Sequence, residues 1–135
     1  MSDPSIEPQN LARSCNEALI LSCLETGPMH GYQIALEIKE RGRGFFKFNY
    51  GTLYPILHKL EKRGLVKGVW SAKDSGGERT GEEEAGRRRK QYTVTANGHR
   101  YAQEQRNSWR DFISNFLEVL SRAESQRNSP EVAGA

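Results

Sequence analysis

The spacing of apolar residues divides this chain of 135 residues into helical segments and a short region of alternation. Apolar side chains recur every three or four residues in four segments, which predicts helices over 11–26, 31–41, 52–63 and 96–125. Apolar and polar residues alternate in "LVKGVW" (65–70) and "RKQYTVT" (89–95), which predicts the two strands of one hairpin. Helix-stopping residues end the first three helical segments: Gly27, Pro28, Gly42, Gly44 and Gly64.

The segment 52–63 has two different faces. Its apolar residues form a stripe that we expect to be buried: Leu53, Ile56, Leu57 and Leu60. The opposite side carries Gly51, Tyr54, Pro55, His58 and Lys62, with Lys59 at its margin. Because proline lacks an amide hydrogen and fits only a first turn or a kink, Pro55 places the start of the helix at Gly51 or Thr52.

The first helical segment is apolar nearly all round, through Leu19, Ile20, Leu21, Cys23 and Leu24. One face can pack on its own domain, and we expect the other to need a further partner. The second segment turns Ile34, Ala35 and Ile38 inward, and the phenylalanines of "FFKFN" (45–49) are expected to plug the core.

The last helical segment carries an apolar seam. Trp109, Ile113, Phe116, Leu120 and Ala123 step by four, three, four and three residues, and Phe112 and Val119 widen the stripe. A repeat near 3.5 residues is typical of a helix that packs along another helix. The polar ends, 1–10 and 126–135, are expected to be a disordered arm and a disordered tail.

Three helices followed by a hairpin are the order of elements in a winged helix-turn-helix. The sequence therefore predicts a mainly α fold with a small β-hairpin, as a DNA-binding domain over 11–95 and a dimerisation helix over 96–125. Such a domain lays its second motif helix in the major groove, which is wide enough to admit it. In this chain that recognition helix is the segment 52–63.

The candidate DNA-binding residues fall into two groups. On and beside the recognition helix, we expect contacts to base edges from Thr52, Tyr54, Pro55 and His58, contacts to phosphates from Lys59 and Lys62, and a contact from Tyr32. At the base of the hairpin, we expect "GRRRK" to contact the DNA phosphates or a narrow minor groove through Arg87, Arg88, Arg89 and Lys90. Structural alternatives stay open: a half-buried aromatic for Tyr54, a surface polar group for His58 and a helix-start residue for Pro55.

Charge changes this picture only through its distribution. The net charge of +3 is small, but basic residues gather around the recognition helix and in "GRRRK", while 74–84 is acidic. A locally basic surface fits a polyanion partner, although ordinary solvated charge explains the composition equally well.

The remaining residues exclude several classes of protein. Cys15 and Cys23 would lie roughly 12 Å apart on one helix, too far for a disulfide, and predict two buried thiols. His30, His58 and His99 fall on separate elements, and no phosphate-binding glycine motif exists, so we expect no enzyme, metal or cofactor. Without a membrane span or a signal-peptide core, the chain is expected to be cytoplasmic, with no membrane partner.

Several motifs resemble the PadR family of bacterial transcriptional regulators. They are "GPMHGYQI" (27–34), "GTLYPILHKLEKRGLV" (51–66), Trp70, "GRRRKQYTVTANG" (86–98) and Trp109. The resemblance implies a dimeric winged helix-turn-helix that mostly represses transcription, with the signature Gly51–Pro55 on its recognition helix. It also implies a dimer through the C-terminal helix packed on the partner's first helix, as in the smaller subfamily with a single C-terminal helix.

Two features depart from the family pattern. The hairpin tip 74–86 is longer than usual and acidic, and its role is open. Val94 and Ala102 stand where the family more often has leucine, which we interpret as mild changes in the core.

The resemblance also bears on regulation. Some members bind flat aromatic compounds at the dimer interface against a tryptophan, and Trp109 stands at the matching place, beside Phe112, Ile113, Phe116 and Leu120. Ordinary packing in the dimer seam is the alternative. A two-fold dimer would read double-stranded DNA with pseudo-palindromic half-sites about 10 bp apart. The leading hypothesis is a repressor released by a small molecule or another signal; the alternative is a winged-helix module for protein contacts without specific DNA binding.

Overall fold

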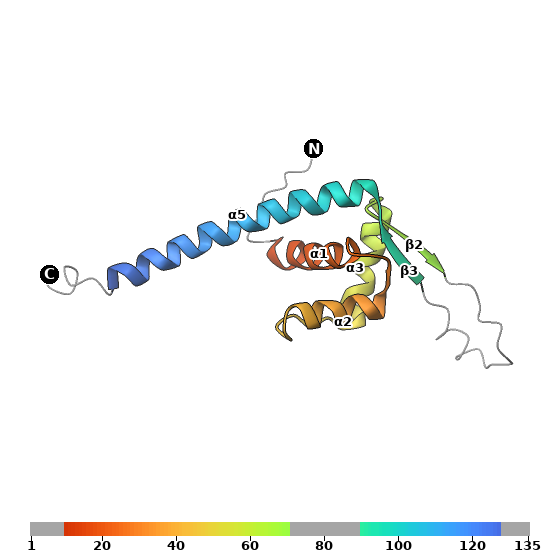
Figure 1. Cartoon of the computed structure of the whole chain (residues 1–135), viewed down its shortest axis with the longest axis horizontal. Helices are drawn as coiled ribbons and strands as arrows, with labels where there is room; N and C mark the ends of the chain where they lie inside the picture. The colour runs from red at the N-terminus through yellow and green to blue at the C-terminus, as the bar shows by residue number, and fades with distance from the viewer. Residues whose placement is uncertain (1–9, 71–89, 128–135) are drawn as a thin grey trace.

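The computed structural model describes residues 10–70 and 90–127 (Figure 1). The hairpin tip 74–86, which is the tip of the wing, and Arg87, Arg88 and Arg89 lie outside the described residues. The helices are α1 (Leu11–Leu24), α2 (Gly31–Arg41), α3 (Tyr50–Lys62) and α5 (Ala96–Arg127). The strands are β1 (Met29–His30), β2 (Val66–Trp70) and β3 (Lys90–Val94). The predicted fold class, mainly α with a small antiparallel β-unit and a long C-terminal helix, is confirmed. The last helix runs two residues past its predicted end.

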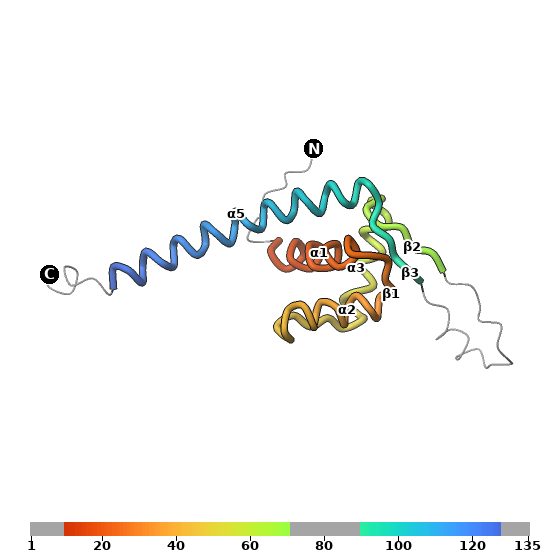
Figure 2. Tube along the Cα trace, viewed as in Figure 1, coloured from red at the N-terminus to blue at the C-terminus, as the bar shows by residue number. Residues whose placement is uncertain are grey.

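The sheet has three strands rather than the two of the predicted hairpin. Its order is β1-β3-β2 and both pairs are antiparallel, with Met29 opposite Tyr92 and Val66 opposite Val94. Figure 2 shows β1 running into the start of α2, beside β3. A strand of two residues is too short to show alternation, so its pairing depends on β3 and leaves no local pattern.

The start of α3 differs from the prediction. The helix begins at Tyr50, because the side chain of Asn49 accepts a hydrogen bond from the Thr52 amide at 2.8 Å and caps the first turn. Pro55 therefore lies in the second turn, where its missing amide leaves the Gly51 carbonyl without the usual partner from residue 55. The predicted end is confirmed, since Gly64 follows α3 with a φ of 73°.

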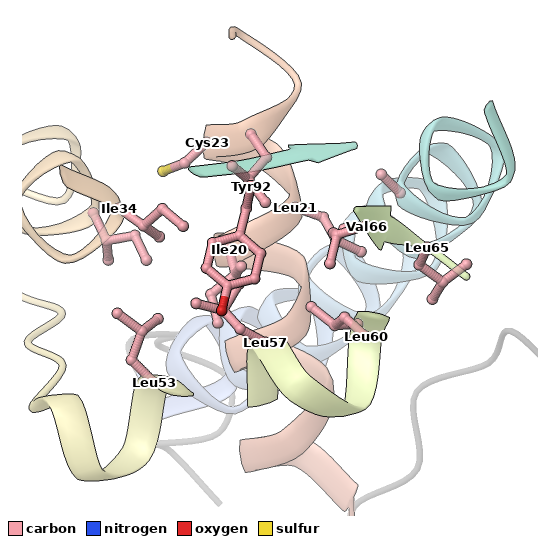
Figure 3. Close-up of a cluster of buried hydrophobic side chains, with 13 residues drawn as sticks. Ile20, Leu21, Cys23, Ile34, Leu53, Leu57, Leu60, Leu65, Val66 and Tyr92 are labelled. Carbon is pink, nitrogen blue, oxygen red and sulfur yellow. The ribbon is translucent and has the colours of Figure 1, made fainter. Parts of the chain in front are cut away.

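The core gathers apolar side chains from all the helices and the sheet. Figure 3 shows Tyr92 of β3 at its centre, between Ile20 of α1 and Leu57 of α3. Burial raises the pKa of Tyr92 to about 12, so this phenol stays neutral. The other fully buried side chains are Leu21, Leu24, Ile34, Leu53 and Leu60. Of the stripe predicted for α3, Leu53, Leu57 and Leu60 are therefore buried, whereas Ile56 is only partly buried.

The phenylalanines between α2 and α3 do not all plug the core as predicted. Phe46 and Phe48 pack against the core, but Phe45 is 83% exposed. Successive side chains of an extended link point to opposite sides, so residues 46 and 48 share the inner side and Phe45 takes the outer one.

The second apolar face of α1 is covered by α5 of the same chain. Figure 1 shows α1 between α5 and α2, and both helices contact it. Gly98, Ala102 and Gln105 are the buried residues of α5, and all lie in its first third. The further partner expected for this face is therefore α5 of the same chain. The packing of a second chain's C-terminal helix on α1 stays a prediction.

Two polar clusters fix α5 on α1. The buried carboxylate of Glu17 pairs with Arg63 at 3.1 Å and accepts a hydrogen bond from the Tyr101 hydroxyl at 2.9 Å. At the other end of α1, Glu25 pairs with Arg106 at 2.8 Å and with His99 at 3.1 Å. Burial opposes the charge on Glu25, but the hydrogen bonds from Arg106 and His99 outweigh it and lower the pKa of Glu25.

Candidate nucleic-acid interface

One face of α3 carries the predicted contact residues on solvent-exposed positions. The buried residues of this helix are Leu53, Leu57 and Leu60. On its exposed side lie Thr52, Tyr54, Pro55, His58, Lys59 and Lys62. The structure thus brings together, on one helix face, all six contact residues predicted for α3.

Tyr54 is both exposed and supported. Its side chain is 37% exposed, and its hydroxyl lies 2.7 Å from the point where a Cβ on residue 31 would stand. Only a glycine at position 31 leaves room for this ring against the first turn of α2. The exposed part of the ring is accessible to a ligand, and both the predicted base contact and the structural alternative for Tyr54 stay predictions.

An exposed aromatic row extends from Tyr54 across to α2. The ring of Tyr50 lies 6.0 Å from that of Tyr54 and 6.4 Å from that of Tyr32, measured between centroids. Sequence analysis selected Tyr32 and Tyr54 but missed Tyr50. The spacing of four residues between Tyr50 and Tyr54 was a signal for it, once the helix is known to begin at residue 50.

Lys90 has a structural role in the wing root. Its ammonium group lies 2.8 Å from Glu61 at the end of α3, with only 19% of its side chain exposed. The amide of Gly68 on β2 donates to the same carboxylate at 3.1 Å. The hydrogen bond from Lys90 lowers the pKa of Glu61 more than burial raises it, and the Gly68 amide lowers it further.

This geometry ties the wing to the recognition helix. A Cβ at Gly68 would collide with the Lys90 side chain, so the glycine provides the path along which Lys90 reaches Glu61. The ammonium also lies 5.8 Å from the ring centroid of Trp70, which is mostly exposed. In the structure Lys90 anchors β3 to α3 through Glu61, and its predicted contact with DNA stays a prediction.

The second half of α5 displays an uncovered apolar stripe. Ile113, Phe116 and Leu120 are 49%, 55% and 51% exposed, and Figure 1 shows this part of α5 extending beyond the other elements. The rings of Trp109 and Phe112 lie 5.5 Å apart, and those of Phe112 and Phe116 are stacked at 6.0 Å. The predicted seam is thus a continuous surface on a single chain.

Two buried polar atoms lie at the N-terminal end of this stripe. The indole nitrogen of Trp109 and the side-chain oxygen of Gln105 have no hydrogen-bond partner in the described part of the chain. They are a donor and an acceptor one helical turn apart, since residues four apart share a helix face.

The histidines and cysteines of the described residues 10–70 and 90–127 do not come together into a metal site. His30, His58 and His99 lie on β1, α3 and α5, and these residues contain no group of three His, Cys, Asp or Glu side chains placed to hold a metal ion. Cys15 and Cys23 are free thiols whose pKa values are raised by burial. No helix in this part of the chain is both long and apolar enough to cross a membrane.

Comparison with known proteins identifies similar chains over most of this length. Residues 20–104 match the profile of the transcriptional regulator PadR-like family. A PadR family transcription regulator from Clostridium difficile is 30% identical, with a TM-score of 0.60 and coverage of 78% of this chain and 97% of that one. A transcriptional regulator from Clostridium thermocellum is 25% identical, with a TM-score of 0.64 and coverage of 84% and 97%.

A further similar structure is that of Bacillus subtilis PadR in complex with operator DNA. It is 25% identical to this chain, with a TM-score of 0.52. The match covers 65% of this chain and 44% of the Bacillus subtilis protein.

Proposed function

Because this chain belongs to the PadR-like family of transcriptional regulators, we propose that it is a sequence-specific DNA-binding repressor that acts as a homodimer. A chain of this family is a regulator of transcription rather than an enzyme. Its target would be double-stranded DNA with a pseudo-palindromic operator, which places its action in the cytoplasm. The observation that carries the proposal is the exposed face of α3, with hydrogen-bonding and aromatic side chains flanked by lysines.

The geometry of α3 suits a major groove. Residues in the N-terminal half of a recognition helix usually contact base edges, and Thr52, Tyr54 and Pro55 occupy that half. His58 follows one turn later, and Lys59 and Lys62 lie where a phosphate backbone would pass. The similar Bacillus subtilis PadR is solved in complex with operator DNA, which supports DNA as the partner of this chain.

The wing would provide the second contact. Glu61 holds the roots of β2 and β3 beside α3 through Lys90 and Gly68, so the wing follows the recognition helix as one unit. The arginines at 87–89 would then reach the sugar–phosphate backbone or a narrow minor groove next to the bases that α3 reads.

The apolar stripe of α5 would form the dimer. Its residues repeat at the spacing of a helix–helix seam, and exposed stripes of this kind on soluble proteins commonly mark association surfaces. Two copies related by a two-fold axis would present two α3 helices to half-sites about 10 bp apart.

The N-terminal end of the same stripe would hold an aromatic effector. The rings of Trp109, Phe112 and Phe116 lie next to one another on this helix and offer flat surfaces to such a compound. An effector bound there would change the angle between the two domains and thereby release the DNA, since one site alters another by favouring one of two arrangements. Titration of flat aromatic compounds should quench Trp109 fluorescence, and the quenching should be absent in Trp109→Phe.

A selection experiment tests DNA binding. The full chain is used to enrich duplexes from a randomised library, and its affinity for the enriched duplex and a scrambled one is measured over a range of salt. We expect an enriched inverted repeat and a log–log salt slope of about −0.9 for each phosphate contacted. Tyr54→Ala should reduce the preference for the enriched duplex over the scrambled one, whereas Lys62→Ala should lower the affinity for both duplexes equally.

Arg122→Ala is the matched control, because it removes one positive charge from the exposed second half of α5, away from α3. Its affinity for both duplexes should equal that of the parent. A library that yields no enriched sequence, together with binding that is almost independent of salt, would favour the alternative of a protein-interaction module.

A further inference from the structure

The aromatic row of Tyr32, Tyr50 and Tyr54 joins the two helices of the helix-turn-helix on its exposed side. Tyr32 belongs to the first turn of α2, and the other two belong to the first two turns of α3. The planes of neighbouring rings are inclined by 29° and 39°, with centroid separations of 6.4 Å and 6.0 Å. These separations lie in the range in which aromatic pairs attract each other.

Tyr50 is the central member of this row. It is the first residue of α3, and the cap that Asn49 makes to Thr52 fixes the backbone on both sides of it. Its side chain remains 47% exposed, so its ring contacts its neighbours without being part of the core. A rigid backbone and a half-exposed ring are suited to hold adjacent side chains in place.

Tyr54 is held from two sides. Its hydroxyl end is seated against Gly31 at the start of α2, and its ring faces Tyr50. With the Gly31 seat alone, the ring could still turn away toward the space that Tyr50 occupies. The ring of Tyr50, whose centroid lies 6.0 Å from that of Tyr54, limits this movement.

We propose that Tyr50 is a positioning residue for DNA sequence recognition: its ring holds Tyr54 in the orientation that reads base edges and links it to Tyr32 on α2. This inference rests on the proposed function. In a helix-turn-helix the first helix crosses the DNA backbone while the recognition helix enters the groove. A row of rings between these helices couples the backbone contact to the base contact.

The consequence is a loss of discrimination rather than of binding. Without the Tyr50 ring, Tyr54 samples several orientations and contacts the correct base only part of the time. The phosphate contacts of Lys59 and Lys62 do not depend on this row, so affinity for unrelated DNA should hold. We expect the ratio of specific to nonspecific affinity to fall by roughly three- to tenfold, the effect of losing one aromatic contact.

The experiment compares Tyr50→Ala, Tyr50→Phe and a control, Phe45→Ala, as full-length chains. Phe45 is an exposed aromatic of the α2–α3 link, and its ring lies edge-on to that of Phe46, outside the row. The parent chain first enriches a duplex from a randomised library. Affinities for that duplex and for a scrambled duplex are then measured for each variant at one salt concentration, with the melting temperature as a check on folding.

The expected result is a reduced specificity ratio for Tyr50→Ala, with the parent's ratio restored in Tyr50→Phe and kept in Phe45→Ala, and all melting temperatures near that of the parent. An unchanged ratio in Tyr50→Ala overturns the inference. A ratio as low in Tyr50→Phe as in Tyr50→Ala also overturns it, because the hydroxyl and not the ring would then matter. A parent chain that enriches no sequence overturns the proposed function itself, whereas the other failures leave DNA binding intact.

Discussion

The two halves of α5 belong to one helix of 32 residues but meet opposite surroundings. In the first half, Gly98, Ala102 and Gln105 are buried, and Tyr101 and Arg106 pair with carboxylates of α1. In the second half, every apolar residue from Ile113 to Leu120 is exposed. The chain thus completes its own core with the first half and leaves the apolar residues of the second half uncovered.

This difference explains how a small domain can complete its core and still carry an uncovered apolar surface. A winged domain alone would leave one face of α1 open, and the first turns of α5 close it with apolar and polar contacts together. The second half adds nothing to the core of its own chain. Substitutions should therefore affect stability in the first half and association in the second.

The largest effect should come from a charge in the second half. Phe116→Asp places a carboxylate in the proposed dimer seam, and a two-fold interface contains each substitution twice. If each removes about 2 kcal/mol, as central interface residues do, the dimer loses about 4 kcal/mol, which corresponds to roughly 1,000-fold in affinity. Sedimentation over a range of concentrations should show a monomer with the helical content of the parent.

Asn115→Asp is the control for this variant, because it adds the same charge at the preceding residue, outside the apolar stripe. It should dimerise like the parent. Equal dissociation of both variants would mean that net charge, and not the stripe, controls association, and a parent that is monomeric at every concentration would refute the seam itself.

The next effect should be a loss of stability from the first half. Gly98→Ala introduces a Cβ that collides with the backbone carbonyl of Leu65 and lies 2.6 Å from Val94. A backbone neighbour cannot move aside cheaply, so we expect about 1–3 kcal/mol of destabilisation. Urea unfolding at a fixed protein concentration measures it, since dimer formation shifts apparent stability with concentration.

Asn97→Ala serves as the comparison, because it changes an exposed residue of the same turn. Its free energy of unfolding should stay within about 0.5 kcal/mol of the parent's, as is usual for surface substitutions. An undiminished stability of Gly98→Ala would show that α5 can shift away from β2 without loss, contrary to the division of α5 drawn here.

The sequence predicted those parts of the fold whose cause is local. The bounds of α2 were confirmed to the residue, because Ile34 and Ile38 set its period and Gly42 ends it. The buried stripe of α3 was likewise visible, and its exposed face followed from it. Local spacing determines such features, and no distant contact is needed to predict them.

The errors arose where a distant partner decides the structure. The pairing of β1 depends on β3, which lies about sixty residues away along the chain. The apolar pattern of α1 showed that a second partner was needed but could not tell that α5 of the same chain is that partner. Tyr50 was missed because Pro55 suggested a later helix start, whereas the Asn49 cap sets it at residue 50.

The smallest effect should distinguish two ion pairs on the two halves of α5. Glu25 pairs with Arg106 and His99 in a partly buried setting, whereas Glu118 and Arg122 form a pair with both side chains largely exposed. The pKa of Glu25 is lowered below its ordinary value of 4.5, so its charge stabilises the folded chain above that pH. That contribution is lost as the pH falls through the lowered pKa, because the folded state must then accept a proton.

Glu25→Gln should therefore destabilise the chain by up to about 1 kcal/mol at pH 7, and the difference from the parent should vanish in acid. Glu118→Gln, which removes the same charge from the other half, should match the parent at both extremes because exposed pairs contribute little. Urea unfolding of the three chains between pH 7 and pH 3 provides the measurement. Equal losses of stability in both variants would mean that the ion pairs of Glu25 stabilise the chain no more than the pair of Glu118 with Arg122 does. The apolar contacts around Gly98 and Ala102 alone would then account for the attachment of the first half of α5.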